Sequence, residues 1–290
     1  MNDLLTNICY GIHTEFMREI FSTIKKEGLA KATVAIYFLL TVWWVFIYFG
    51  KTTDAPVNHI FGFVYGGFSL FGAAIGLISV KYWGGWKSIM GKATLALSLG
   101  LFAQGFGQYS FWFYNYALKI PIPYPGIPDI GFASTIAFYV FAGLLLASAS
   151  GAKVSLRYLI NKIQLVIIPL LMIGVSYFLF LKGSGLDWTN PLKTILDYGY
   201  PLGDAAYISI AILTYSLSKK LLGGLMKSRV LLLLLAFVAQ YAADFVFIYF
   251  SDQYFPASFI DFFYMTSYFV MALGLIHLKT SVDKLRSKPE

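Results

Sequence analysis

The side chain with the most unusual setting for chemistry is an aspartate inside a long apolar run. Asp244 falls within the segment 230–250, about six residues from one end and therefore roughly 9 Å below it at 1.5 Å per residue. Gln240 precedes it by one helical turn. An ionisable group is costly to place in hydrocarbon and usually faces the protein interior or a wet cavity. The pattern favours either a ligand or proton site or a buried polar cluster that fixes helix packing.

This polar stripe has a counterpart about 136 residues earlier. Each copy has glutamine or aspartate at i and i+4 and phenylalanine at i+7: Gln104, Gln108 and Phe111, then Gln240, Asp244 and Phe247. A loop containing tyrosine and proline follows each stripe, and a second apolar run follows each loop. If the two copies pack against each other, the four polar side chains converge. We therefore expect a ligand pocket around them.

Three aspartates stand where apolar runs resume after these loops or after a similar one. Each has a proline nearby: Asp129 with Pro128, Asp204 with Pro201, and Asp261 with Pro256. Carboxylates stabilise helix N-termini, and proline suits the first turn, so helix capping explains all three. The alternative is an outer cavity, lined by these carboxylates with Tyr124 and Tyr200, that holds a small polar or cationic ligand.

Other site chemistries find little support. The single cysteine, Cys9, excludes an internal disulfide framework. His13, His59 and His277 share no helix face, which argues against a haem or zinc site. No apolar run carries a central lysine, and we find neither a phosphate-binding loop nor a serine nucleophile motif. We expect no metal and no cofactor, and an enzyme is the least favoured class, with carboxylate-only chemistry left open.

The composition places these residues in a membrane. Apolar residues make up 58% of the chain and charged residues only 12%, against about 25% charged in soluble domains. The formal charge of +8 does not indicate a nucleic-acid partner, because the basic residues sit in short segments between apolar runs. Such segments set membrane orientation. The lipid bilayer is the expected surrounding.

Eight apolar runs are close to the roughly 20 residues that a helix needs to cross a bilayer. They are 32–49, 60–80, 93–117, 130–150, 163–181, 201–218, 230–250 and 257–278. The prediction is an all-α polytopic protein of two tandem four-helix halves, 32–150 and 151–278. Residues 1–31 precede them with an amphipathic helix over 4–27, which either lies on the membrane surface or packs on the cytoplasmic loops. A basic tail, 279–290, follows.

Basic residues also predict the orientation. Of the 22 Lys and Arg residues, one set of loops and termini holds all but Lys51, Lys119, Lys182 and Lys193. The richer side is cytoplasmic by the positive-inside rule. With eight crossings, both termini lie in the cytoplasm of a cell whose inner membrane holds the protein, and the tyrosine-proline loops face outward.

The loops resemble a known pattern. Multi-pass sensor domains of bacterial signalling proteins, which precede diguanylate cyclase or histidine kinase modules, carry tyrosine-proline, a small residue, aspartate and then an aromatic residue. The matching residues here are Tyr124, Pro125 and Asp129, then Tyr200, Pro201, Gly203, Asp204 and Tyr207, then Asp261, Tyr264 and Tyr268. The first copy has two extra residues before its aspartate. The resemblance covers spans three to eight and implies ligand sensing.

The sequence thus favours a ligand-sensing or ligand-binding membrane protein with an outer-facing pocket between the halves. The ligand is a small molecule or a lipid. The twelve residues after span eight are too few for an output module, so a sensor of this size is free-standing or acts through a partner chain. The alternatives are an accessory or scaffold subunit of a larger membrane complex, and a small-solute or proton-coupled transporter that uses Asp244 as the titrating group.

Overall fold

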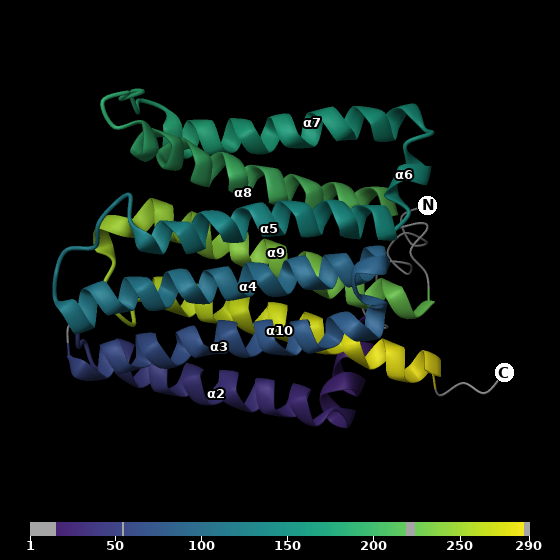
Figure 1. Cartoon of the computed structure of the whole chain (residues 1–290), viewed down its shortest axis with the longest axis horizontal. Coiled ribbons are helices and arrows are strands. Elements are labelled where there is room, and N and C mark those ends of the chain that lie inside the picture. The colour runs from purple at the N-terminus through teal and green to yellow at the C-terminus, as the bar shows by residue number, and fades with distance from the viewer. Residues whose placement is uncertain (1–15, 54, 219–223, 287–290) are drawn as a thin grey trace, which may run out of the picture.

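The computed structural model describes residues 16–53, 55–218 and 224–286, and these form a bundle of long helices without strands (Figure 1). Its α-helices are α2 (Gly28–Phe49), α3 (Pro56–Val80), α4 (Ile89–Trp112), α5 (Ile127–Ala149), α6 (Ala152–Ser155), α7 (Leu159–Ser176), α8 (Pro191–Ser218), α9 (Gly224–Phe250) and α10 (Phe259–Arg286). Short π-helical turns, η3 (Phe113–Leu118) and η4 (Tyr177–Leu181), extend α4 and α7. The 3-10 turns are η1 (Lys81–Trp83), η2 (Gly85–Lys87) and η5 (Ser251–Gln253).

Seven helices of the described ranges are long and apolar enough to cross a membrane. They contain the predicted spans 32–49, 60–80, 93–117, 163–181 and 230–250, and they match 130–150 and 257–278 closely. The chain is therefore a multi-pass helical membrane protein. The remaining predicted span, 201–218, lies in α8, which runs alongside the others (Figure 1) but is too polar to belong to the seven.

The predicted start of that span is wrong. The helix α8 begins at Pro191, ten residues before Pro201, which lies inside it. The local reason is a better start signal: the Asn190 side chain accepts a hydrogen bond from the Lys193 amide at 3.2 Å, and Pro191 occupies the first helical position. As a consequence Asp204 sits in the middle of α8 and does not cap a helix.

Six helices pack in a closed ring, in the order α3, α4, α5, α8, α9, α10 and back to α3. The peripheral helix α2 packs mainly against α10, and α7 packs mainly against α8. The core therefore lies between helices from both predicted halves. The closest helix pair is α4 and α5, where a side chain at Gly131 would meet the backbone of α4 at Ala103 and Gly107.

The N-terminal segment packs on the protein. Residues 16–26 are helical, and Ile20 and Ile24 contact a buried cluster that includes Ile276. The Thr23 hydroxyl and the His277 ring nitrogen Nδ1 are 2.7 Å apart. The described part of the predicted amphipathic helix thus packs against helices of the bundle, and its placement relative to a membrane surface stays a prediction. Residues 4–15 of that prediction lie outside the described residues.

The two ends of the bundle differ in character. Residues 16–26, the α6 turn and the C-terminal end of α10 gather at one end (Figure 1). The connections after α4, α7 and α9, which include the proline-rich loop 119–126, gather at the other. The first end carries the basic segments recognised in the sequence, and the second, here called the loop end, holds the cavity described next.

Candidate functional site

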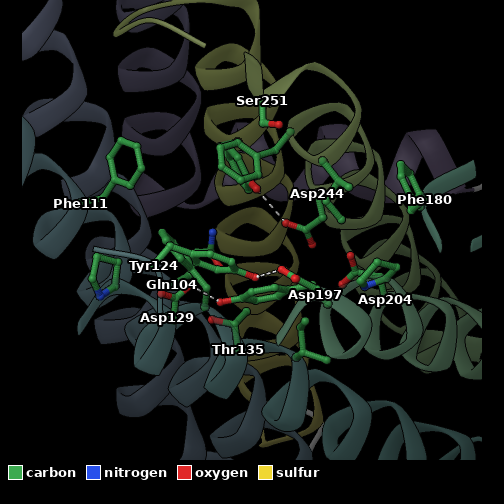
Figure 2. Close-up of a pocket in the computed structure, with 18 of the residues that line it drawn as sticks. Gln104, Phe111, Tyr124, Asp129, Thr135, Phe180, Asp197, Asp204, Asp244 and Ser251 are labelled. Carbon is green, nitrogen blue, oxygen red and sulfur yellow. Dashed lines mark hydrogen bonds between the residues drawn. The ribbon is translucent and has the colours of Figure 1, made fainter. Parts of the chain in front are cut away.

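A cavity of about 590 Å³ lies at the loop end of the bundle. Its walls come from α4, α5, α8, α9 and the start of α10, and the loop 119–126 and the turn η4 complete its mouth. This volume falls within the range that small-molecule sites occupy. Figure 2 shows polar side chains from several helices pointing into the same space.

The cavity brings together eight of the nine residues that the sequence singled out. They are Gln104, Gln108, Tyr124, Asp129, Tyr200, Asp204, Asp244 and Asp261. The ninth, Gln240, is buried behind the wall, where its Nε2 donates to Asp244 at 3.0 Å and its Oε1 accepts from Ser267 at 2.9 Å. The two copies of the polar stripe thus meet at one place.

Asp244 is held by three neutral donors. Its Oδ1 accepts hydrogen bonds from Gln240 and from the Tyr264 hydroxyl, both at 3.0 Å, and its Oδ2 accepts one from the Tyr207 hydroxyl at 2.9 Å. No Lys or Arg among the described residues forms a salt bridge with it within 4.0 Å. The carboxyl is therefore oriented by its neighbours without a protein counter-ion.

Asp261 and Asp129 have similar partners at two different helix seams. Asp261 on α10 accepts from the Tyr65 hydroxyl of α3 at 2.8 Å, and Asp129 on α5 accepts from the Tyr200 hydroxyl of α8 at 2.7 Å. Gln108 donates in turn to the Tyr65 hydroxyl at 2.7 Å. A tyrosine-aspartate bond thus joins α3 to α10, and a second joins α5 to α8.

The capping prediction is confirmed for these two aspartates. The Oδ2 of Asp129 accepts from the Gly126 amide at 2.7 Å, just before α5. The Oδ2 of Asp261 accepts from the Ala257 amide at 2.7 Å, just before α10. Both carboxylates satisfy backbone groups that a helix start leaves without partners. Both carboxyl groups thus stabilise the start of a helix, and both also line the cavity.

Asp204 differs from the other aspartates. Its side chain is only 3% exposed, and its Oδ1 has no hydrogen-bond partner within the described structure. The hydroxyl of Tyr139, fully buried on the same cavity wall, has none either. Buried polar groups are nearly always paired. Figure 2 shows Asp204 and Asp244 pointing into the same part of the cavity.

The mouth contains one residue that the sequence did not single out as part of the site. Asp197 on α8 accepts a hydrogen bond from the Tyr124 hydroxyl at 2.7 Å and pairs with Lys193 at 2.7 Å. Partial burial, followed by the bond to Asp197, raises the pKa of the Tyr124 phenol, which keeps it a neutral donor. The spacing of Lys193 and Asp197, one helical turn apart, was the available signal.

The cavity is acidic and aromatic. Five aspartates line it, and no described Lys, Arg or His does. The rest of the lining is largely aromatic: Phe111, Phe132, Tyr139, Phe180, Tyr207, Phe247, Tyr254 and Tyr264, besides Tyr124 and Tyr200. Aromatic faces and carboxylates both attract cations.

The cavity has an exposed mouth and a buried floor. Tyr124 at the mouth is 44% exposed, whereas Gln104 at the floor is 3% exposed. Beyond the floor, toward the basic end, Leu97, Leu101 and Phe237 are fully buried in the main apolar core. The space therefore ends inside the bundle.

Comparisons of the chain with protein-family models, with curated proteins and with solved structures found no match. The resemblance to bacterial sensor domains thus stays a prediction.

Proposed function

We propose that this chain is a ligand-binding membrane protein whose small-molecule ligand enters the cavity from the outer side of the inner membrane. The observation that carries the proposal is convergence. Gln104, Gln108 and Asp244, which are polar side chains within apolar runs, line one cavity of about 590 Å³. A buried polar cluster needed only for helix packing would leave no such space between its members.

The orientation follows from charge. The cavity opens at the loop end, whereas the segments rich in Lys and Arg lie at the opposite end. The positive-inside rule puts the basic end in the cytoplasm. With α8 as an eighth crossing, both termini are cytoplasmic and the cavity faces outward.

Sensing is favoured by where the cavity lies. In the proposed architecture, α2–α5 and α7–α10 are tandem halves. The order of helices around the ring then makes α3 equivalent to α8, α4 to α9 and α5 to α10. The bonds from Tyr65 to Asp261 and from Tyr200 to Asp129 then occupy equivalent seams between the halves. If the halves can adopt two relative positions, a ligand that binds one of them more tightly shifts the population toward that position.

Binding is favoured over transport by the closed floor. A transporter needs a route toward the cytoplasm in at least one of its states, and in this structure the apolar core of Leu97, Leu101 and Phe237 fills that path. The same closed floor suits a receptor that releases its ligand to the side from which it came.

The test is ligand-dependent stabilisation of the purified protein in mild detergent. A panel of amines, alcohols, sugars and carboxylates is added, and the unfolding temperature is measured, since binding to the native state raises it by mass action. We expect at least one class to stabilise the protein and Asp244→Asn to abolish the effect. Asp187→Asn removes an equal charge from an exposed loop position and is the matched control. If no class stabilises the wild-type protein, the proposal fails.

An accessory-subunit role is the second candidate, and α7 is the observation in its favour. This helix packs mainly against α8, and Ser176 is its one buried residue. A partner helix could cover its apolar face, which lipid also covers well. Mild-detergent purification separates the two functions, because a subunit would bring a stoichiometric membrane partner with it.

A further inference from the structure

We infer that the ligand is a protonated primary or secondary amine with an apolar or aromatic body, its ammonium group held by Asp204 and Asp244. The inference rests on the proposed ligand-binding function and narrows it to one chemical class. Three properties of the cavity carry it: the sign of its charge, its unpaired acceptor and its aromatic wall.

The charge of the lining selects a cation. Five aspartates face the cavity, and the described structure provides no basic side chain in its wall. Asp129 and Asp261 accept hydrogen bonds from backbone amides at the starts of α5 and α10, and Asp197 forms an ion pair with Lys193. Asp204 and Asp244 are left without a cationic partner. An anion placed there would find carboxyl groups and no basic side chain to bind it, whereas an ammonium group forms an ion pair with a carboxylate.

The geometry favours an organic cation over a metal ion. In the part of the chain that the structure describes, no three His, Cys, Asp or Glu side chains gather as a metal site requires. The Oδ1 of Asp244 already accepts from Tyr264 and Gln240, and its Oδ2, which accepts from Tyr207 alone, has room for one further donor. A hard cation needs several free oxygens at short range, and the cavity does not offer them.

The unpaired Oδ1 of Asp204 requires a donor. Asp204 lines the cavity, its side chain is only 3% exposed, and this oxygen has no hydrogen-bond partner among the described residues. The buried Tyr139 hydroxyl also has no hydrogen-bond partner among the described residues. An N–H of a primary or secondary ammonium satisfies Asp204 with a charge-assisted hydrogen bond. A quaternary ammonium has no N–H and would leave the oxygen unpaired.

The aromatic wall selects the rest of the molecule. Phe247, Tyr254, Phe111 and Phe132 line the same cavity as Asp204 and Asp244. Such side chains stabilise apolar groups by burial and aromatic rings by edge or offset contacts. The cavity of about 590 Å³ accommodates a ring and a short chain.

The probe is 2-phenylethylammonium, tested on the full chain in detergent micelles. Three isosteres are compared with it: 2-phenylethanol, 3-phenylpropionate and trimethyl(2-phenylethyl)ammonium. We expect the amine to raise the unfolding temperature in a concentration-dependent way and to bind at least tenfold more tightly than each isostere. We expect Asp204→Asn to lower its affinity about 10- to 100-fold, which corresponds to a lost hydrogen bond to a charged group. Asp187→Asn should leave the affinity unchanged.

Each outcome separates the two claims. If the alcohol or the carboxylate binds as tightly as the amine, the amine assignment is wrong while ligand binding stands. If the quaternary compound binds as tightly, the role of the Asp204 oxygen is wrong. If none of the four compounds, and no member of the wider panel, stabilises the protein, the proposed function fails as well. The isostere comparison uses the wild-type protein, so a variant that misfolds cannot obscure the result.

Discussion

The close approach of α5 to α4 positions the wall of the cavity, and a single methyl group should disturb it. Gly131 lies on α5, two residues after Asp129, and faces the backbone of α4. A Cβ at this position would be 2.5 Å from the Ala103 carbonyl oxygen and 2.5 Å from the Gly107 amide nitrogen. Ordinary contacts of a Cβ begin at about 3.4 Å, so Gly131→Ala forces the two helices apart by about 0.9 Å.

The energetic cost follows from which atoms are met. Overpacking typically costs about 1–3 kcal/mol, and the upper end applies because backbone atoms cannot rotate aside as a side chain can. Replacing a helical glycine with alanine returns about 1 kcal/mol through helix propensity. The expected net loss is about 2 kcal/mol. At about 2–4 °C per kcal/mol for a protein of comparable size, the unfolding temperature falls by about 4–8 °C.

Intrinsic fluorescence during heating measures this effect, since the chain contains six tryptophans. Gly174→Ala is the matched control: Gly174 lies on α7, and an added Cβ there would meet no atom within 4 Å. We expect the control to keep or slightly raise the unfolding temperature. If Gly131→Ala is as stable as Gly174→Ala, the inferred α4–α5 contact is wrong.

Three further substitutions test polar contacts. Asp261→Asn places an amide N–H opposite one of two buried donors, the Tyr65 hydroxyl or the Ala257 backbone amide. The midpoint of denaturant unfolding should therefore fall by the equivalent of about 1–3 kcal/mol. An unchanged midpoint would contradict this role of Asp261. Glu19→Gln weakens the 3.3 Å ion pair with the buried Arg229, so protease added to the protein in detergent should cut the N-terminal segment faster than in the wild type. Equal cleavage rates would contradict the docking of this segment. Tyr124→Phe removes the hydrogen bond to Asp197 at the cavity mouth, worth about 1 kcal/mol. The ammonium probe should then dissociate about fivefold faster in stopped-flow fluorescence.

Local patterns were enough to predict the spans and the polar stripes. A run of about 20 apolar residues identifies its own helix, and seven such helices are present in the described ranges. The caps at Asp129 and Asp261 were also predictable, because each involves an amide three or four residues earlier. The stripe position of Asp244 sufficed to place it on an inward face.

Contacts between residues that are far apart in the sequence could not be predicted from it. Tyr124 and Asp197 are 73 residues apart and meet only when the loop 119–126 folds over α8. The unpaired oxygen of Asp204 is a property of its whole surroundings. The start of α8 was misplaced because two prolines, Pro191 and Pro201, each suit a first turn, and only the cap at Asn190 distinguishes them.

The most direct test of the ligand site is the position of a bound probe. Crystals grown with 2-(4-bromophenyl)ethylammonium would reveal the bromine by its anomalous scattering. We predict a bromine peak against the aromatic wall near Phe247, with the ammonium group between Asp204 and Asp244, and no peak in crystals of Asp204→Asn at the same concentration. A peak confined to the lipid-facing helix surfaces, or one in the cavity that persists in Asp204→Asn, would contradict the account.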